Sequence, residues 1–354
     1  MMVYMLSSAY SGCSYIRIQL PAYENGFDTD KDSIQSPKKS VDEIRQTVMG
    51  ADVVVFHRPE ENTYHDLARI LKKDGKKVVM DNDDTFKLCN HPLANLTPDA
   101  KDKDVERRAK EIDNFAEIAD LVTTTTKTLA DEYKEKNSNT IILPNCIDPF
   151  QWDEPLKNKS KKIRIGLVGS ATFGYDYGHV EDVLEELSDR EDVQLFMFGL
   201  GDKKHRKENP NVTKTFKKDY EFWDSLDIEH QPWCPIHEYP QKLNEARLDI
   251  MLIPRQDNYF NRCKSNIKFL EASMCETPII AQSFKDGPYE EIIHKENGVL
   301  VKNNDKWMEE INYLIDNPDK RKQIGKNAMK YTLKNYNIED NAHLWDDAYK
   351  SLFI

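Results

Sequence analysis

The segment Arg255–Ala281 carries residue types that suit a diphosphate and a sugar. It reads RQDNYFNRCKSNIKFLEASMCETPIIA, with apolar residues at helical spacing after Lys264. A helix beginning near Ser265 would use this serine as its N-cap and place Lys268 and Glu271 one turn apart. N–H groups, a hydroxyl and ammonium charges suit a diphosphate, and a carboxylate can accept hydrogen bonds from two sugar hydroxyls. On residue types alone, the alternative is a capped surface helix with a Lys–Glu pair.

A glycine turn earlier in the chain offers a second phosphate contact. Gly169 follows the apolar run Ile163–Val168. The glycine lets the backbone approach a phosphate, and Ser170 and Thr172 can donate hydrogen bonds to it. An ordinary tight turn is the alternative interpretation.

Short apolar runs alternate with amphipathic, charged stretches along the whole chain. The runs are rich in β-branched residues and too short for helices, which indicates buried parallel strands. Strands that alternate with helices predict a doubly wound α/β fold, in which ligands bind outside the carboxyl ends of the strands. The expected strands are Val3–Leu6, Val53–Phe56, Val78–Met80, Leu121–Thr124, Ile141–Leu143, Ile163–Val168, Val193–Phe198, Ile250–Ile253, Thr277–Ala281 and Gly298–Val301.

A polar stretch divides the chain into two halves of similar size. Asp153–Lys162 is poor in apolar residues and contains Pro155, which is typical of a linker. The alternation of strand and helix restarts after it. We therefore expect two Rossmann-like domains, 1–155 and 156–335, whose facing surfaces form one cleft.

Composition and charge bound the class of protein. The chain has 354 residues, of which 39% are hydrophobic, enough for two cored domains. Its six cysteines are scattered without a C-x-x-C pair, so we expect neither a disulfide framework nor a metal site. The net charge of −12 argues against a tightly held nucleic acid. No apolar run approaches the roughly 20 residues of a membrane span, and no signal peptide is visible, so we expect a cytoplasmic protein.

The segment around Lys268 resembles the donor-binding signature of the glycosyl transferases group 1 family, retaining enzymes of the GT-B type. Many members read roughly K-S-x-x-K-x-x-E-x-x-A-x-G-x-P-V-I-A, and this chain matches at Lys264, Ser265, Lys268, Glu271 and positions 278–281. The resemblance implies that the two lysines bind the diphosphate and that Glu271 holds the ribose. It also implies a nucleotide-sugar donor, such as a UDP- or GDP-sugar, and no cofactor.

Two positions depart from the family pattern. Cys275-Glu276 stands where a glycine is common, which makes the turn before Pro278 atypical. Cys263 stands where the more general pattern has another glutamate, eight residues before Glu271. The usual sugar contact at that position is therefore missing.

The resemblance extends over most of the chain. Ile163–Ser170 resembles the opening strand and glycine turn of the nucleotide-binding domain, and Trp233–Leu243 the region where members place the donor base. Trp233 or Ile236 would then pack on the base, with a core role as the alternative. Residues 336–354 resemble the terminal helix that packs back on the first domain.

In the first domain, the family likeness points to residues on the cleft. Gly12, in the small-residue loop after the first strand, would permit close approach of a substrate, and Arg17 would meet a phosphate or the acceptor. His57 follows the run Val53–Phe56, where an imidazole is placed to contact the transferred sugar. A surface arginine and a structural histidine are the alternatives.

An acidic cluster, Asp81–Asp84, follows the run Val78–Met80. We interpret it as a cleft-facing turn that contacts the acceptor, through Asp81 and Asp84, with a solvated helix cap as the alternative. The match to the D-x-D-x-T of haloacid-dehalogenase-type phosphatases lacks the downstream acidic pair, and the two-domain pattern does not suit the metal-binding D-x-D of GT-A enzymes.

The resulting hypothesis is a metal-independent glycosyltransferase that moves a sugar to a hydroxyl acceptor with retention. Lys264, Lys268 and the Gly169–Ser170 turn would stabilise the leaving diphosphate, and His57 is a further catalytic candidate. Two alternatives stay open. One is a phage-type enzyme that acts on modified DNA bases, and the other is a non-catalytic nucleotide-sugar binder. The oligomeric state and the acceptor are not encoded in any motif that we identify.

Overall fold

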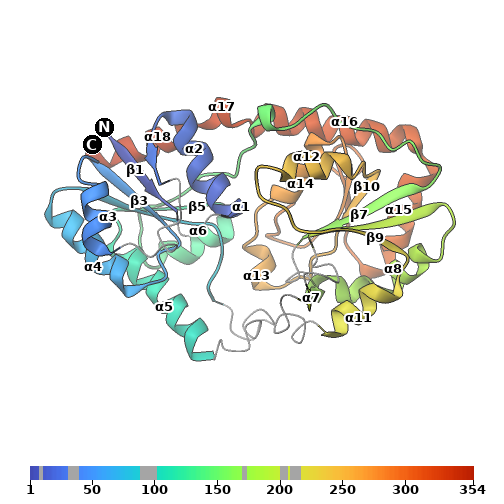
Figure 1. The fold of residues 1–354 in the computed structure, drawn as a ribbon, viewed down its shortest axis with the longest axis horizontal. Helices are drawn as coiled ribbons and strands as arrows, with labels where there is room; N and C mark the ends of the chain where they lie inside the picture. Colours follow the sequence, from blue (N-terminus) through green and yellow to red (C-terminus); the bar gives the residue numbers. More distant parts are fainter. Residues whose placement is uncertain (8–10, 31–39, 88–101, 170–173, 200–205, 208–216) are drawn as a thin grey trace.

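The computed structural model describes residues 1–7, 11–30, 40–87, 102–169, 174–199, 206–207 and 217–354. They form two lobes that lie side by side, each built on a six-stranded parallel sheet with helices around it (Figure 1). This arrangement confirms the predicted pair of Rossmann-like units.

The first sheet has the strand order β2-β1-β3-β4-β5-β6. All residues of β3 and β5 are buried, as expected of parallel strands covered on both faces. The strands are β1 (Val3–Leu6), β2 (Asp28–Thr29), β3 (Val53–His57), β4 (Lys77–Asn82), β5 (Leu121–Thr124) and β6 (Thr140–Ile142). The helices that follow them are α1 (Gly12–Ser14), α2 (Leu20–Asn25), α3 (Val41–Thr47), α4 (Asn62–Lys73), α5 (Asp102–Ile118) and α6 (Lys127–Lys134).

Alternate residues of these strands enter two separate cores, because successive side chains point to opposite faces of a sheet. Val54 and Phe56 pack with helices α3 to α6. Val53 and Val55 pack on the other face with α2 and with two C-terminal helices, α17 (Ile338–Asn341) and α18 (His343–Lys350).

The second sheet has the strand order β12-β11-β10-β7-β8-β9, the classical dinucleotide-fold order when counted from β7. Its strands are β7 (Ile163–Val168), β8 (Val193–Phe198), β9 (Ile228–Gln231), β10 (Ile250–Ile253), β11 (Ile279–Gln282) and β12 (Val299–Val301). Its helices are α7 (Gly174–Tyr177), α8 (Glu181–Ser188), α11 (Lys217–Ser225), α12 (Tyr239–Glu245), α13 (Tyr259–Arg262), α14 (Ile267–Met274), α15 (Trp307–Asp316) and α16 (Pro318–Asn335). The connections leave β7 in opposite directions, which opens a crevice at the ends of β7 and β10.

The chain crosses between the lobes a second time at its C-terminal end, as predicted for this fold. The long helix α16 lies on the second lobe, and α17 and α18 then pack on the first, where Trp345 is fully buried (Figure 1). The N–H of Ile338 donates a hydrogen bond to the carbonyl of Ile147 at 2.9 Å. This bond joins the two segments of the chain that connect the lobes. We propose 1–155, 156–335 and 336–354 as the domain boundaries.

Helix α16 packs so closely on the turn after α14 that Gly325 has no room for a side chain. A Cβ there would lie 2.1 Å from the carbonyl oxygen of Glu276. We expect Gly325→Ala to lower the free energy of unfolding by about 1–3 kcal/mol, because the backbone must shift to remove the overlap. Thermal or urea unfolding measures this change. Gly178→Ala is the control, since no atom lies within 4 Å of its added Cβ. Equal stability of the two variants would contradict the close approach.

Candidate active site

Polar contacts join the two lobes where the loops after their strands meet. Tyr259 of α13 donates a hydrogen bond to Glu132 of α6 at 2.6 Å, across 127 residues of sequence. The Nζ of Lys264 lies 2.6 Å from the carboxylate of Asp84, across 180 residues. The predicted meeting of the two domains thus brings together side chains from both.

A cluster of three polar side chains lies at the start of α14. The Nζ of Lys268 lies 2.8 Å from the Oε2 of Glu271 and 3.1 Å from the hydroxyl of Tyr239. That hydroxyl also donates to the same Oε2 at 2.8 Å. Only 8% of Glu271 is exposed, so the interpretation as a surface Lys–Glu pair is wrong. The cluster therefore combines a cation (Lys268), a carboxylate (Glu271) and a phenol (Tyr239), and the Lys268 and Glu271 side chains are mostly buried.

The protonation of Tyr239 is set by its surroundings. Burial first, and then the charge of Glu271, raise the pKa of the Tyr239 phenol well above its ordinary value. The hydroxyl therefore keeps its proton near neutral pH and remains a donor to the carboxylate. Tyr239 thereby orients the carboxylate that the family resemblance assigns to a ribose.

Helix α14 begins slightly later than predicted. Its N-cap is Asn266, and Ser265 lies outside the helix. The Ser265 hydroxyl instead accepts a hydrogen bond from the amide of Asn145 at 2.9 Å. The predicted N-cap role of Ser265 is therefore wrong, because an interlobe contact takes its hydroxyl.

The helix before Lys264, α13, is held by a buried network. Arg255 lies 3.4 Å from Asp176 and donates to Asn261 at 3.1 Å, and the amide of Asn261 donates to Asp176 at 2.6 Å. Each of the three is at most 6% exposed. The network ties α13, which directly precedes Lys264, to α7. The Nζ of Lys264 also lies 3.8 Å from the ring centre of Phe260.

The backbone of the glycine turn packs closely against the residue that follows β8. The N–H of Gly169 donates to the carbonyl of Phe198 at 2.9 Å, and a Cβ on Gly199 would lie 2.6 Å from the oxygen of Gly169. Gly199 also has a φ of +95°, which favours glycine. The predicted contacts Ser170 and Thr172 lie outside the described residues.

The two residues predicted to meet the donor base lie between β9 and α12. Trp233 follows β9 and is 70% exposed, so its indole is available for stacking. Ile236 lies against the first lobe, where its Cδ1 is 3.6 Å from the position of a Cβ on Gly12. Gly12 therefore faces the second lobe, as expected of a residue on the cleft.

His57 lies at the end of β3 but is only 1% exposed. Its Nδ1 is 3.3 Å from the Ser14 hydroxyl and its Nε2 is 3.2 Å from Asp83, which also accepts from Arg58 at 2.7 Å. Burial opposes the ionisation of Asp83, but Arg58 and His57 outweigh it and hold the pKa of Asp83 well below its ordinary value. With both ring nitrogens engaged, His57 fits the structural alternative.

Arg17 and Asp81 lie inside the first lobe, and neither side chain is exposed. The guanidinium donates to both Asp81 oxygens, at 3.0 and 2.6 Å, and to the carbonyl of Leu143 at 2.6 Å. Thr123 donates to Asp81 at 2.7 Å. The expectation that these two residues face the acceptor is not met, because they satisfy each other in the core. Of the two acidic residues predicted to face the acceptor, Asp84 is the one that contacts the second lobe, through Lys264.

Sequence reasoning missed Tyr239, Tyr259 and Glu132. Tyr239 lies within the stretch that resembles the base-binding region, but its bond to a carboxylate 32 residues away has no local sequence signal. Tyr259 and Glu132 meet only because the lobes face each other. Within the described ranges, no His, Cys, Asp and Glu side chains gather as they would around a metal ion, and every helix is too short or too polar to cross a bilayer.

Comparison with known protein families shows to which family the chain belongs. The family model described as glycosyl transferases group 1 matches residues 150–331, about half of the chain. The chain belongs to the glycosyl transferases group 1 family. The match covers the second lobe, including the Lys268 cluster, and ends within α16. No curated protein matches the sequence.

Solved structures show the same fold over the full chain of this group 1 protein. Sucrose-phosphate synthase from Thermosynechococcus elongatus has a TM-score of 0.71 at 15% identity, covering 100% of this chain and 99% of that one. Anabaena HepE in complex with UDP has a TM-score of 0.66 at 13% identity, covering 99% and 100%. A glycosyltransferase from Rickettsia africae has a TM-score of 0.65 at 12% identity, covering 99% and 98%. These likenesses confirm the GT-B fold.

The two departures from the group 1 signature have distinct structural settings. Cys263 is fully buried and packs in the core cluster of the first lobe, so no acidic side chain projects from this position. Glu276 adopts a φ of 49°, in the left-handed region that glycine favours. Its carboxylate lies 2.5 Å from the Nζ of Lys157, which helps to hold the turn.

Proposed function

We propose that the protein is a retaining glycosyltransferase that takes a sugar from a nucleoside-diphosphate donor and passes it to a hydroxyl acceptor. The observation that carries this proposal is the half-buried cluster of Lys268, Glu271 and Tyr239 in a chain of the group 1 family. A UDP-sugar is our first candidate for the donor, since one similar structure holds UDP-glucose. A GDP-sugar remains the second.

Each residue of the cluster has a role in this proposal. Glu271, oriented by Tyr239, would accept hydrogen bonds from the ribose hydroxyls, and bonds to a charged acceptor are strong. Lys268 and Lys264 would stabilise the charge that develops on the leaving diphosphate as the glycosidic bond breaks. Because these cations are fixed in the protein, we propose that a metal is not required. We also propose that the acceptor hydroxyl attacks the face from which the diphosphate leaves, which retains the configuration.

A panel of nucleotide sugars tests the donor proposal. A ligand that binds only the folded protein at 100 times its Kd adds about 2.7 kcal/mol to the free energy of unfolding. We expect UDP- or GDP-sugars to raise the Tm and the corresponding nucleoside monophosphates to raise it less. If no nucleotide sugar changes the Tm, the proposal is wrong.

A non-catalytic nucleotide-sugar binder is the second candidate, favoured by Cys263 in place of the first family glutamate. Release of nucleoside diphosphate from the stabilising donor separates the two candidates. An enzyme releases it at a measurable rate, whereas a binder raises the Tm without release.

Asp84 competes with the donor for Lys264 in this proposal. Its carboxylate is 2.6 Å from the ammonium group, and both side chains are about one-fifth exposed. A diphosphate that binds Lys264 must replace this partner. We expect Asp84→Asn to lower the Kd for UDP about fivefold, equivalent to about 1 kcal/mol for a partly exposed pair. Titration calorimetry at low salt measures this. Asp74→Asn, which removes an exposed partner of Arg45, should leave the Kd unchanged. A weaker affinity in Asp84→Asn would contradict the competition.

A further inference from the structure

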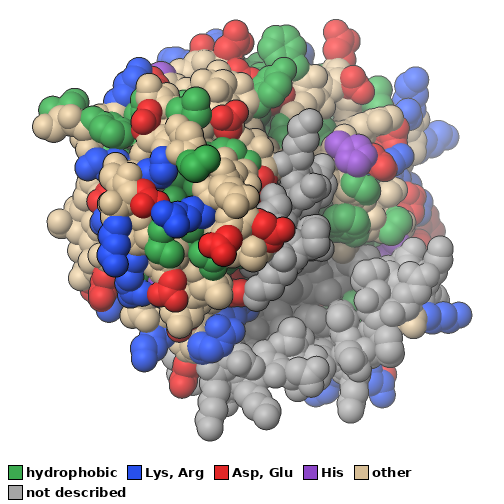
Figure 2. Space-filling model, turned by 60° about the vertical axis from the view of Figure 1, so that its left-hand side comes forward, with side chains coloured by type: hydrophobic (Ala, Val, Ile, Leu, Met, Phe, Trp, Pro, Cys, Tyr) green, Lys and Arg blue, Asp and Glu red, His purple; other side chains and the backbone are tan. Residues whose placement is uncertain are grey.

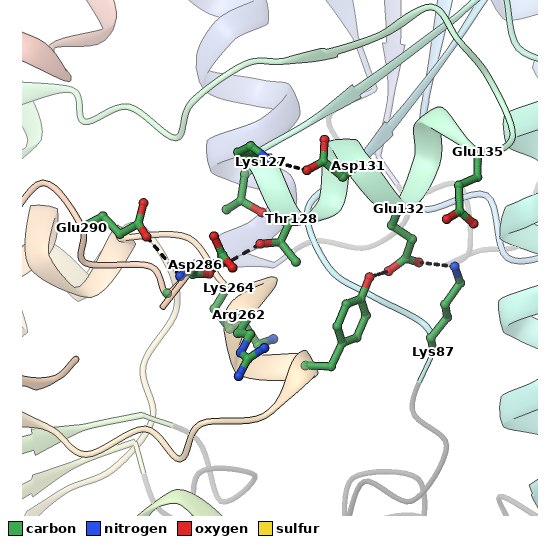
Figure 3. Close-up of a pocket in the computed structure, with 13 residues that line it drawn as sticks. Lys87, Lys127, Thr128, Asp131, Glu132, Glu135, Arg262, Lys264, Asp286 and Glu290 are labelled. Carbon is green, nitrogen blue, oxygen red and sulfur yellow. Dashed lines mark hydrogen bonds and ion pairs between the residues drawn. The ribbon is translucent and has the colours of Figure 1, made fainter. Parts of the chain in front are cut away.

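A cavity of about 430 Å³ opens between the lobes beside Lys264. Helix α6 of the first lobe forms one wall, and α13 with the loop 286–290 of the second lobe forms the other (Figure 3). Its volume falls in the range of small-molecule sites. Since the proposed function assigns Lys264 to the donor diphosphate, a molecule in this cavity would lie next to the reacting sugar.

The cavity wall carries charges of both signs. Figure 3 shows these side chains gathering from both lobes around the opening. The carboxylates outnumber the cations by one. The cations are Lys87, Lys127, Arg262 and Lys264, and the carboxylates are Asp131, Glu132, Glu135, Asp286 and Glu290.

Each of the four cations already has a carboxylate partner within 4 Å. Because the proposed function gives Lys264 to the donor diphosphate, an anionic acceptor would be left with Lys87, Lys127 and Arg262, and it would have to displace a protein carboxylate from each of these that it used. The carboxylates would also repel it, since like charges at short range are destabilising. The pairs are Lys87–Glu132, Lys127–Asp131, Arg262–Asp257 and Lys264–Asp84.

Glu132 anchors the wall between the lobes. It is 6% exposed, and its Oε2 accepts hydrogen bonds from Tyr259 at 2.6 Å and from Thr85 at 3.0 Å. Its other oxygen lies 3.7 Å from Lys87. These bonds fix Glu132 from three separate segments, whereas Glu135, one turn along α6, is exposed at the cavity.

A neutral molecule rich in hydroxyl groups suits such a wall. Hydroxyls can donate to carboxylates that remain paired with their cations, and no ion pair has to be broken. On the face of the molecule in Figure 2, basic and acidic side chains are likewise interspersed. A nucleic acid would instead require a set of cations that are available for its phosphates.

We infer that this cavity binds the acceptor, and that the acceptor is an uncharged, carbohydrate-like polyol. This inference rests on the proposed function, because it takes the donor to lie at the Lys268 cluster. It excludes the hydroxymethylated bases of duplex DNA as the acceptor class.

The test measures release of nucleoside diphosphate from UDP-glucose, or from the donor that stabilises the protein most, with and without acceptors. The acceptors are neutral methyl glycosides and disaccharides, their sulfated counterparts, and duplex DNA that contains 5-hydroxymethylcytosine. We expect a neutral saccharide to raise the rate at least tenfold and to yield a glycosylated product by mass. Stimulation by DNA or by sulfated saccharides alone, or by none of the panel, overturns the inference.

Release itself reports on the proposed function separately. If the wild-type protein releases no nucleoside diphosphate either without an acceptor or with any acceptor of the panel, the proposed function fails. If release is present while no neutral saccharide stimulates it, only the acceptor inference fails.

Two variants test the cavity itself. Glu132→Gln should raise the KM for the neutral acceptor at least tenfold and change kcat less. Because a buried change can impair folding, Glu135→Gln serves as an exposed second variant, with an expected rise of about threefold. Glu117→Gln, an exposed position on α5, is the control. Unchanged acceptor KM in both folded cavity variants overturns the inference.

Discussion

Replacement of Lys268 by alanine should lower kcat for sugar transfer by roughly 100- to 1,000-fold. Loss of one fixed group that stabilises charge in a transition state typically has an effect of this size. Lys268 is the cation nearest to Glu271, at 2.8 Å, and it is held there by Tyr239 as well. In the proposed mechanism its charge acts mainly when the diphosphate departs, so kcat should fall more than affinity for the donor. Initial rates at saturating donor measure the effect.

The chain offers a matched control for Lys268. Lys242 and Glu245 form the same i,i+3 pair on α12, at 2.9 Å, but both side chains are more than one-third exposed. Lys242→Ala should leave the rate within about twofold, because exposed pairs contribute little. If both variants keep full activity, or both lose it, the role assigned to Lys268 is contradicted.

Replacement of Arg17 by methionine should destabilise the first lobe by about 3–5 kcal/mol, because a buried charge would lose its partner. Asp81 has no exposed surface, and the guanidinium provides two of its hydrogen bonds. Thr123 alone would remain as a donor to the carboxylate. The Tm should fall on the order of 10 °C for a domain of this size. Chemical unfolding followed by circular dichroism measures the loss.

A surface pair provides the comparison for Arg17. Arg45 lies 2.8 Å from Asp74, with exposed fractions of 48% and 36%. Arg45→Met should cost about 0–1 kcal/mol. The double variant Arg17→Met/Asp81→Leu should recover much of the lost stability, because it removes both buried charges. A small effect of Arg17→Met would show that the pair is not a main support of the lobe.

The central strands could be predicted because their physics is local. Runs such as Leu121–Thr124 and Val193–Phe198 agree with β5 and β8 residue for residue, since strands covered on both faces are continuous apolar runs. The pattern missed β2 and β9. Each is an edge strand: β2 has two residues, and β9 reads Ile-Glu-His-Gln with partly exposed side chains. The other two edge strands, β6 and β12, are apolar and were predicted, so β2 and β9 were missed because they are short or polar and not because they lie at an edge.

The candidate site was predictable only where a short motif carries it. Lys268 and Glu271 are one helical turn apart, so their proximity follows from sequence spacing. The burial of Arg17 does not, because an arginine is rarely buried and its partner Asp81 is 64 residues away. The partners of Glu132 depend on how the two lobes meet, which no local pattern records.

The central claim is that Glu271 holds the ribose of a nucleoside diphosphate. Titration calorimetry with UDP and with 2′,3′-dideoxyuridine diphosphate, on the wild-type protein and on Glu271→Gln, tests it most directly. We expect the wild-type protein to bind UDP at least tenfold more tightly than the dideoxy compound, and Glu271→Gln to bind the two within about threefold. Equal discrimination by both proteins would contradict the claim.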